Sequence, residues 1–199
     1  MFEPTAQTGH DLVAGERLFR GHPLHRRVEV ELDGLRLHVR PVLPGDTGRI
    51  ARFVQGLSPT TAYRRFLAPT PRLTARALAT LVDVDHHDRE TLLALTADGP
   101  SSRLIGVGQY VRLTEARAEI ALVVGDAWQR RGVGRMLAAQ LAQAAAEEGI
   151  AELTATVLAE NPAPQRLAVG LTAAVEAVHA GTTVDLTIRC PTMATPRQV

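Results

Sequence analysis

The residues best suited to bind a charged ligand lie together in the stretch WQRRGVGRML, which begins at Trp128. An apolar run precedes this stretch and an alanine-rich run follows it, a pattern typical of a strand, a loop and the start of a helix. The first N–H groups of a helix have no internal partner and carry the positive end of its dipole. The stretch therefore predicts a phosphate site made of helix amides, two glycines and three guanidinium groups: Gly132, Gly134, Arg130, Arg131 and Arg135.

Two common phosphate-binding motifs do not fit this stretch. A P-loop ends in Gly-Lys-Ser/Thr, and this chain contains no lysine, because all 22 of its basic residues are arginine. A dinucleotide fingerprint needs a third glycine and follows the first strand of a parallel sheet, whereas this strand follows two that read as antiparallel. The alternative to a phosphate site is a solvated basic turn in which the glycines only ease the start of the helix.

The strand before the loop carries a candidate catalytic acid. Glu119, Ala121 and Val123 share one face of the alternating segment AEIALVV, so one carboxylate interrupts a small apolar row. A carboxylate in this position can accept a proton in catalysis. The structural alternative is a strand-end carboxylate paired with Arg117 or Arg112.

The pattern of the remaining chain predicts a mixed α/β domain with an antiparallel half and a βαβ crossover. Residues 28–41 read as a hairpin that turns at Asp33-Gly34, and three helices follow, with Asp46, Ser58 and Thr74 at their starts. The later elements are strands, a long helix that stops at Gly149, a short helix after Asn161 and a hairpin that turns at Ala180-Gly181. Residues 1–27 are expected to be a partly ordered extension, and residues 28–199 the domain.

Composition narrows the possible functions. The net charge of +1 gives no general argument for binding nucleic acid or an anionic membrane. The single cysteine, Cys190, cannot form an internal disulfide and predicts a reducing, cytoplasmic environment. No secretory signal and no apolar run of membrane-spanning length are evident, so the chain is expected to be soluble. His86 and His87 lie among three aspartates, but no third ligand of the usual kind is in view, and no metal is expected.

Gln129 to Gly134 resembles the acetyl-CoA signature Q/R-x-x-G-x-G/A of the GNAT superfamily of N-acetyltransferases. Between about Leu35 and Val169, the segments LRLHVRPVLPGD, LSPTTAYRRF, LVDVDHHDRETLLAL and VLAEN resemble the bacterial Pat-type protein lysine acetyltransferases. The resemblance implies an α/β (α+β) GNAT fold: a mixed, mostly antiparallel sheet with flanking helices, splayed at its fourth and fifth core strands, residues 118–124 and 152–158. It also implies transfer of an acetyl group from acetyl-CoA to a primary amine, and the Pat-type branch implies that this amine is a protein lysine.

The same resemblance implies roles for individual residues. Glu119 is the expected catalytic base, directly or through a water, and the backbone N–H of Val123 or Leu122 is expected to stabilise the oxyanion. Val124 lies roughly 16 Å from Glu119 at strand rise, a distance comparable to the reach of a pantetheine chain. The resemblance places acetyl-CoA on Leu122, Val123, Val124, Gln129, Arg130, Arg131, Gly132, Val133, Gly134, Arg135 and Asn161.

The resemblance is weakest after Asn161, where Leu171 replaces an expected aromatic residue and the helix lacks the tyrosine that protonates the thiolate in many superfamily members. An acetyl-CoA sensor or partner-binding module with weak or no transfer is therefore one alternative. A small-molecule amine acetyltransferase is another. Asn161 is either a contact of the coenzyme arm or a helix N-cap, and Tyr63 and Arg65 lie on the expected acceptor side. The expected assembly is a monomer or a homodimer.

Overall fold

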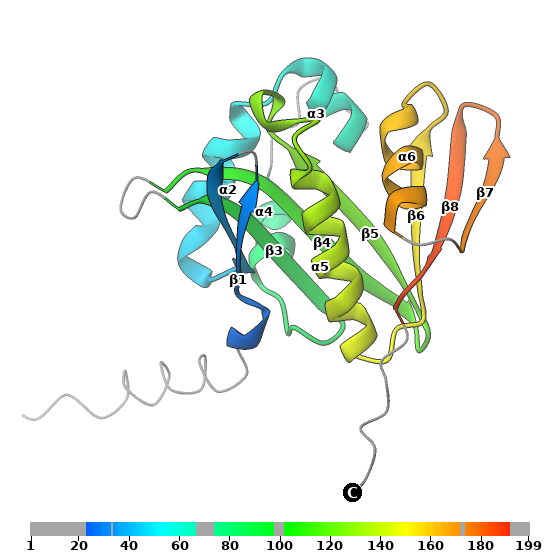
Figure 1. Cartoon of the computed structure of the whole chain (residues 1–199), viewed down its shortest axis with the longest axis horizontal. Coiled ribbons are helices and arrows are strands. Elements are labelled where there is room, and N and C mark those ends of the chain that lie inside the picture. Colours follow the sequence, from blue (N-terminus) through cyan, green and yellow to red (C-terminus); the bar gives the residue numbers. More distant parts are fainter. Residues whose placement is uncertain (1–22, 33, 67–73, 98–101, 172–173, 192–199) are drawn as a thin grey trace, which may run out of the picture.

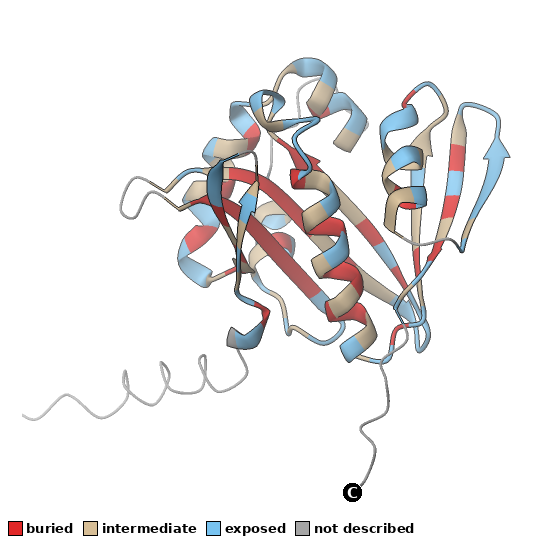
Figure 2. Cartoon of the chain, in the orientation of Figure 1, coloured by how far each residue is buried: buried red, intermediate tan, exposed pale blue. Residues whose placement is uncertain are grey.

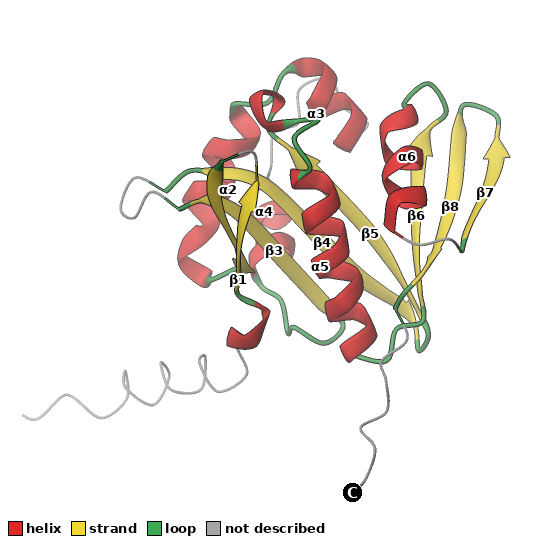
Figure 3. Ribbon diagram, viewed as in Figure 1, coloured by secondary structure: helices red, strands yellow, loops and turns green. Residues whose placement is uncertain are grey.

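The computed structural model describes residues 23–32, 34–66, 74–97, 102–171 and 174–191. Its strands are β1 Val28–Leu32, β2 Leu35–Pro41, β3 Arg89–Thr96, β4 Leu104–Thr114, β5 Arg117–Val124, β6 Glu152–Leu158, β7 Val175–Ala180 and β8 Thr183–Arg189. Its helices are α2 Thr47–Gln55, α3 Pro59–Phe66, α4 Ala75–Val82, α5 Val133–Glu147 and α6 Pro162–Leu171, with short 3-10 turns η1 Leu24–Arg26, η2 Pro44–Asp46 and η4 Asp126–Trp128. Figures 1 and 3 show how these elements are arranged.

The described strands form one eight-stranded sheet in the order β1-β2-β3-β4-β5-β6-β8-β7. Neighbouring strands run antiparallel except β5 and β6, which are parallel and connected through α5. In Figure 1, α5 lies in front of the sheet, α2 and α4 lie behind it, and α6 lies in front of β6. The expected mixed, mostly antiparallel α/β fold is confirmed, as are the hairpins 28–41 and 175–189. Asp33, in the first of the two expected turns, lies outside the described residues.

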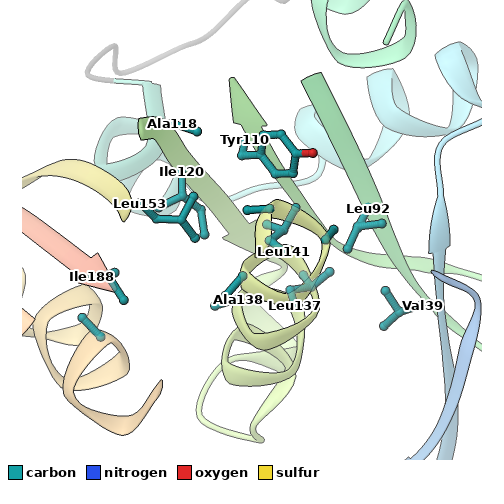
Figure 4. Close-up of a cluster of buried hydrophobic side chains, with 14 of the residues drawn as sticks. Val39, Leu92, Tyr110, Ala118, Ile120, Leu137, Ala138, Leu141, Leu153 and Ile188 are labelled. Atoms are coloured by element: carbon teal, nitrogen blue, oxygen red, sulfur yellow. The ribbon is translucent and has the colours of Figure 1, made fainter. Parts of the chain in front are cut away.

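Helix α5 packs closely on the centre of the sheet and so fixes the position of its own N-terminus. Leu137, Ala138 and Leu141 point from α5 toward the sheet, in a core that contains Leu92 and Tyr110 (Figure 4). Two glycines of β4 permit this close approach, because a Cβ at Gly106 would lie 2.8 Å from Leu137 Cδ1 and one at Gly108 would lie 2.7 Å from Leu141 Cδ1. Figure 2 shows the resulting buried band along β3 and β4 beneath α5.

The structure confirms the predicted cap at Thr74 and the predicted stop at Gly149, but not the predicted cap at Asp46. Thr74 caps α4 by accepting a hydrogen bond from the Ala77 N–H, and Gly149 follows α5 with a φ of +77°. Asp46 precedes α2 as expected, but its side chain does not cap that helix. Its carboxylate instead accepts two hydrogen bonds from Arg40 and one from the Leu43 N–H, because the turn η2 brings these donors together.

Strands β5 and β6 separate along their length. They pair only at Arg117–Glu152, Ala118–Leu153 and Glu119–Thr154. Beyond Glu119, β5 remains paired with β4, while β6 turns away and pairs with β8. The expected splay is therefore confirmed, and Glu119 occupies the last paired position at its closed end.

Residues 23–27, expected within a partly ordered extension, are attached to the domain through Arg26, which is buried at 6% exposure. Its guanidinium lies 2.6 Å from Glu90 Oε2, 3.0 Å from Glu147 Oε2 and 2.6 Å from Glu148 Oε1. Burial alone would lower the pKa of Arg26, but these hydrogen bonds outweigh it and raise the pKa. Arg26 thereby ties the chain before β1 to the start of β3 and the end of α5. Residues 1–22 lie outside the described residues.

This cluster predicts how acid will act on stability. Burial favours the neutral carboxyl, but hydrogen bonds to Arg26, together with His25 for Glu147 and His87 for Glu148, hold both pKa values below the ordinary 4.5. Their stabilising contribution is complete above pH 4.5 and is lost as the pH falls through the depressed values. We expect Arg26→Gln to lower the free energy of unfolding at pH 7 by about 3–5 kcal/mol, because Glu90 stays buried without its cation.

Urea denaturation at several pH values between 3 and 7 measures both effects. The natural chain is expected to lose stability below pH 4.5 more steeply than Arg26→Gln, because protonation relieves repulsion among the three carboxylates once the guanidinium is gone. Equal stability of the two proteins at pH 7, or equal acid slopes, would contradict this role for Arg26.

Candidate functional site

The loop between β5 and α5 has the backbone of an anion-binding site. Gly132, the residue before α5, has a φ of +84°, and Arg130 has a φ of +59°, which is uncommon for a residue with a side chain. The N-cap residue of α5, Gly132, has no side chain that could cap the helix, and the first turn of α5 contains no acidic residue. The first amides of this 15-residue helix are therefore open to a ligand, at the end of the helix that favours negative charge.

The arginines of this loop increase its positive charge. Arg130, Arg131 and Arg135 are exposed, and in the described part of the chain none of them pairs with a carboxylate. The Arg131 guanidinium lies 5.5 Å from the centre of the Trp128 ring, which restrains its position. Val133 is buried beneath the loop, and a Cβ at Gly134 would lie 3.2 Å from Leu167 Cδ1, so α6 closes over the second glycine.

A polar network that the sequence analysis missed attaches this loop to α3. The Asp126 carboxylate accepts hydrogen bonds from the Ser58 N–H, the Ser58 hydroxyl and the Thr61 hydroxyl at 3.0, 2.6 and 2.7 Å. Burial would raise the pKa of Asp126, but these bonds lower it, so the carboxylate stays ionised. The sequence indicates that a helix starts at Ser58, but the partner of Ser58, Asp126, lies 68 positions further along the chain.

Gln129 belongs to the same network. Its Nε2 donates to Thr61 Oγ1 and to the Val124 carbonyl, both at 3.0 Å. The resemblance implied that Gln129 binds acetyl-CoA. In the structure its donors are bound to the protein, because Thr61 and the open end of β5 lie within reach. Gln129 therefore connects the loop, the end of β5 and the first turn of α3.

The splay exposes one edge of β5. The Gly125 N–H donates to the Ile105 carbonyl at 2.9 Å, which sets the pattern of the ladder with β4. Since backbone groups of alternate residues point to the same side, the N–H of Val123 also faces β4, whereas those of Leu122 and Val124 face the gap. A linear ligand with amide groups can bind along this edge, between the phosphate loop and Glu119.

Glu119 is exposed at the closed end of this gap. The two partners proposed as a structural alternative are bound elsewhere: Arg117 lies 2.6 Å from Glu152, and Arg112 lies 2.7 Å from Asp88. Among the described residues Glu119 makes no hydrogen bond or ion pair. A free carboxylate beside an open strand edge has the position that a general base needs.

Four further residues that could take part in binding or catalysis differ in burial and hydrogen bonding. Asn161 is buried directly before α6, and no hydrogen bond of its side chain is found within the described residues, so it does not act as a side-chain cap there. Burial raises the pKa of Cys190 to about 11, which makes its thiol a poor nucleophile. Burial likewise raises the pKa of Tyr110, whose hydroxyl donates to the His87 carbonyl. Tyr63 is 41% exposed on α3.

The histidine and aspartate residues at positions 85–88 make contacts within the protein. His86 lies 3.0 Å from Glu90, and His87 lies 2.6 Å from Glu148. Asp85 accepts the backbone N–H groups of residues 87–89 and forms the turn before β3. Within the described ranges, no group of three or more histidine, cysteine, aspartate and glutamate side chains is arranged to hold a metal ion. No helix in the same ranges is long and apolar enough to cross a membrane.

A mixed sheet that opens between two parallel strands, with an uncapped helix starting at the open end, defines the class of GNAT acetyltransferases. The sequence matches the acetyltransferase (GNAT) domain family over residues 36–171. The crystal structure of the GNAT domain of S. lividans PAT superposes with a TM-score of 0.76 and 29% identity, over 84% of this chain and 99% of that one. The chain belongs to the GNAT acetyltransferase domain family, a class of acetyl-CoA-dependent acyltransferases.

Two curated relatives are also similar. The acetyltransferase Pat of Mycolicibacterium smegmatis is 33% identical over 132 residues, which cover 65% of this chain and 39% of Pat. The acetyltransferase PA5475 of Pseudomonas aeruginosa is 27% identical over 140 residues, which cover 70% of this chain and 75% of that protein. The chain thus spans well under half of the Mycolicibacterium protein.

Proposed function

We propose that this chain transfers the acetyl group of acetyl-CoA to a primary amine, the side chain of a protein lysine. The observation that carries the proposal is one continuous site: an uncapped helix N-terminus, an open edge of β5 and a free carboxylate at the closed end of the splay. The first part fits a diphosphate, the second fits the amides of pantetheine, and the third fits an amine that must lose a proton. Similarity to Pat-type enzymes supports a protein lysine.

In this proposal the amides of Arg131 to Arg135 and the flanking guanidinium groups hold the diphosphate, and Asn161 contacts the pantetheine arm. Acetyl-CoA supplies the acetyl group as a thioester. Glu119 accepts the proton of the amine, directly or through one water, which frees the nitrogen lone pair for attack. The N–H of Leu122, which faces the gap, stabilises the negative charge that develops on the carbonyl oxygen.

A second candidate is an acetyl-CoA-binding sensor with weak or no transfer. It is favoured by α6, which contains no tyrosine to protonate the departing thiolate. The two tyrosines of the chain are buried Tyr110, which is hydrogen-bonded to the His87 carbonyl, and exposed Tyr63 on α3. A thiolate is a good leaving group without an acid, so this difference lowers the rate rather than prevents transfer.

Thiol release from acetyl-CoA distinguishes the candidates. The assay compares a lysine-containing protein, a polyamine and an aminoglycoside, with a calorimetric titration of acetyl-CoA alongside. Because the chain has no lysine, acetyl label on a lysine side chain must be on the acceptor. Release with the lysine protein above the other two supports the proposal. Binding without release on any amine supports the sensor, and release restricted to a small amine supports the small-molecule alternative.

A further inference from the structure

Arg65 has surroundings that are unusual for a structural arginine. It lies in the last turn of α3 and lines a small pocket together with Phe66, Gln109, Ala121 and Val123. Ala121 and Val123 belong to the same face of β5 as Glu119, which is the face opposite α5. The guanidinium carbon lies 5.0 Å from the centre of the Phe66 ring, so the side chain is held toward the pocket. Arg65 therefore faces the strand segment between Glu119 and the phosphate loop.

Among the described residues, no acceptor binds the donors of this guanidinium. Its Nε is fully buried and has no hydrogen-bond partner in that part of the chain. No hydrogen bond or ion pair from its other nitrogens is found within the described ranges. An arginine presents five N–H donors, and a buried donor without an acceptor costs free energy. Burial accordingly lowers the pKa of Arg65, while the charge of Glu119 opposes that effect.

The chemistry that satisfies such a group is an oxygen acceptor with negative charge. A carboxylate accepts two parallel hydrogen bonds from a guanidinium and neutralises it, whereas an ammonium is repelled. We propose that Arg65 determines acceptor specificity by binding a carboxylate of the acceptor, so that the preferred substrate is a primary amine with a carboxylate close to it. This inference rests on the proposed function, because it places the acceptor amine at Glu119. It makes polyamines poor acceptors.

The carboxylate has two possible sources, an acidic residue beside a lysine in a protein or the α-carboxylate of a free amino acid. Two end-blocked peptides that differ only in Glu or Gln beside one lysine test the first source. Nα-acetyl-lysine and its amide test the second. For the correct source, we expect kcat/KM of the natural chain to be roughly tenfold higher with the carboxylate than with its amide analogue, as for a charge-assisted hydrogen bond.

The same pairs are compared in Arg65→Gln and in the matched control Arg64→Gln, which removes an exposed charge from the adjacent position of α3. Arg65→Gln is expected to reduce the preference for the carboxylate to about one, and Arg64→Gln to retain it. Equal use of carboxylate and amide by the natural chain overturns the proposal. So does an Arg65→Gln variant that is slower on both members of a pair by the same factor, which would make Arg65 a support for Glu119.

A binding measurement separates this inference from the proposed function. Peptides with norleucine in place of lysine cannot be acetylated, but they retain the Glu or Gln beside it. Calorimetry with the CoA-loaded chain is expected to show tighter binding of the Glu peptide, and Arg65→Gln is expected to abolish the difference. If the chain transfers no acetyl group but still binds the Glu peptide more tightly than the Gln peptide, only the proposed function is rejected. Transfer without any carboxylate preference, in either pair of amines, would reject only the role of Arg65.

Discussion

Glu119→Gln is expected to lower kcat by about 10²- to 10⁴-fold at neutral pH while the Kd for acetyl-CoA stays unchanged. The amide has nearly the same shape as the carboxylate but cannot accept a proton, and Glu119 makes no hydrogen bond or ion pair in the described part of the chain whose loss would disturb the fold. Steady-state thiol release measures kcat, and calorimetry measures the affinity for acetyl-CoA.

The pH dependence of this variant separates a base from a binding group. A free lysine amine has a pKa near 10.4, so at higher pH a larger fraction of the acceptor is already deprotonated and needs no base. The deficit of Glu119→Gln is therefore expected to shrink as the pH rises toward 10. The matched control is Glu115→Gln, which makes the same change at an exposed residue before β5. Near-normal turnover of Glu119→Gln, or an equal deficit at every pH, would remove Glu119 from the role of base.

Gly132→Val is expected to weaken acetyl-CoA binding by about 100-fold or more. Gly132 has a φ of +84°, which a β-branched residue adopts only with strain, and a Cβ there would lie 3.2 Å from Leu32 Cδ1. The loop must move to relieve the backbone strain and the close contact with Leu32. The amides at the start of α5 then no longer converge on one position. Several hydrogen bonds to the diphosphate are lost together, each worth about 1.5–3 kcal/mol when the acceptor is charged.

Gly149→Val is the matched control for this substitution. Gly149 also has a positive φ, +77°, but it lies at the other end of α5 and has open space around it. Both variants are expected to lose about 1–2 kcal/mol of stability from backbone strain, whereas only Gly132→Val should lose affinity for acetyl-CoA. Urea denaturation and calorimetry on the two variants provide the comparison. Equal affinities would show that the loop conformation does not determine coenzyme binding.

The elements that position the site follow from local patterns in the sequence. Alternation places Glu119, Ala121 and Val123 on one face of β5, and the glycines beside Val133 mark the start of a long amphipathic helix. These signals act within a few residues, which is why the strand, the loop and the helix were expected in the right order. The splay came from the resemblance to a family, because no local pattern shows where two parallel strands separate.

The contacts that the sequence did not reveal are long-range. Arg26 meets Glu147 and Glu148 across more than 120 positions, and Asp126 meets Ser58 and Thr61 across 68 and 65. No periodicity indicates which of many charged or hydroxyl side chains will meet once the sheet is formed. The direction of the Gln129 side chain was unexpected for the same reason, since its acceptor Thr61 lies in α3, 68 positions away in the sequence. The resemblance placed Arg65 on the expected acceptor side, but its buried Nε without a partner among the described residues is visible only in the structure.

The central claim is that the uncapped start of α5 binds the diphosphate of acetyl-CoA. Parallel calorimetric titrations with acetyl-CoA and with S-acetylpantetheine, which carries the same thioester without the diphosphate, test it most directly. We expect saturable binding of acetyl-CoA and binding of S-acetylpantetheine at least about 100-fold weaker, because only the longer ligand reaches the helix amides and the arginines. No binding of acetyl-CoA, or equal affinity for the two ligands, would contradict the assignment of this site.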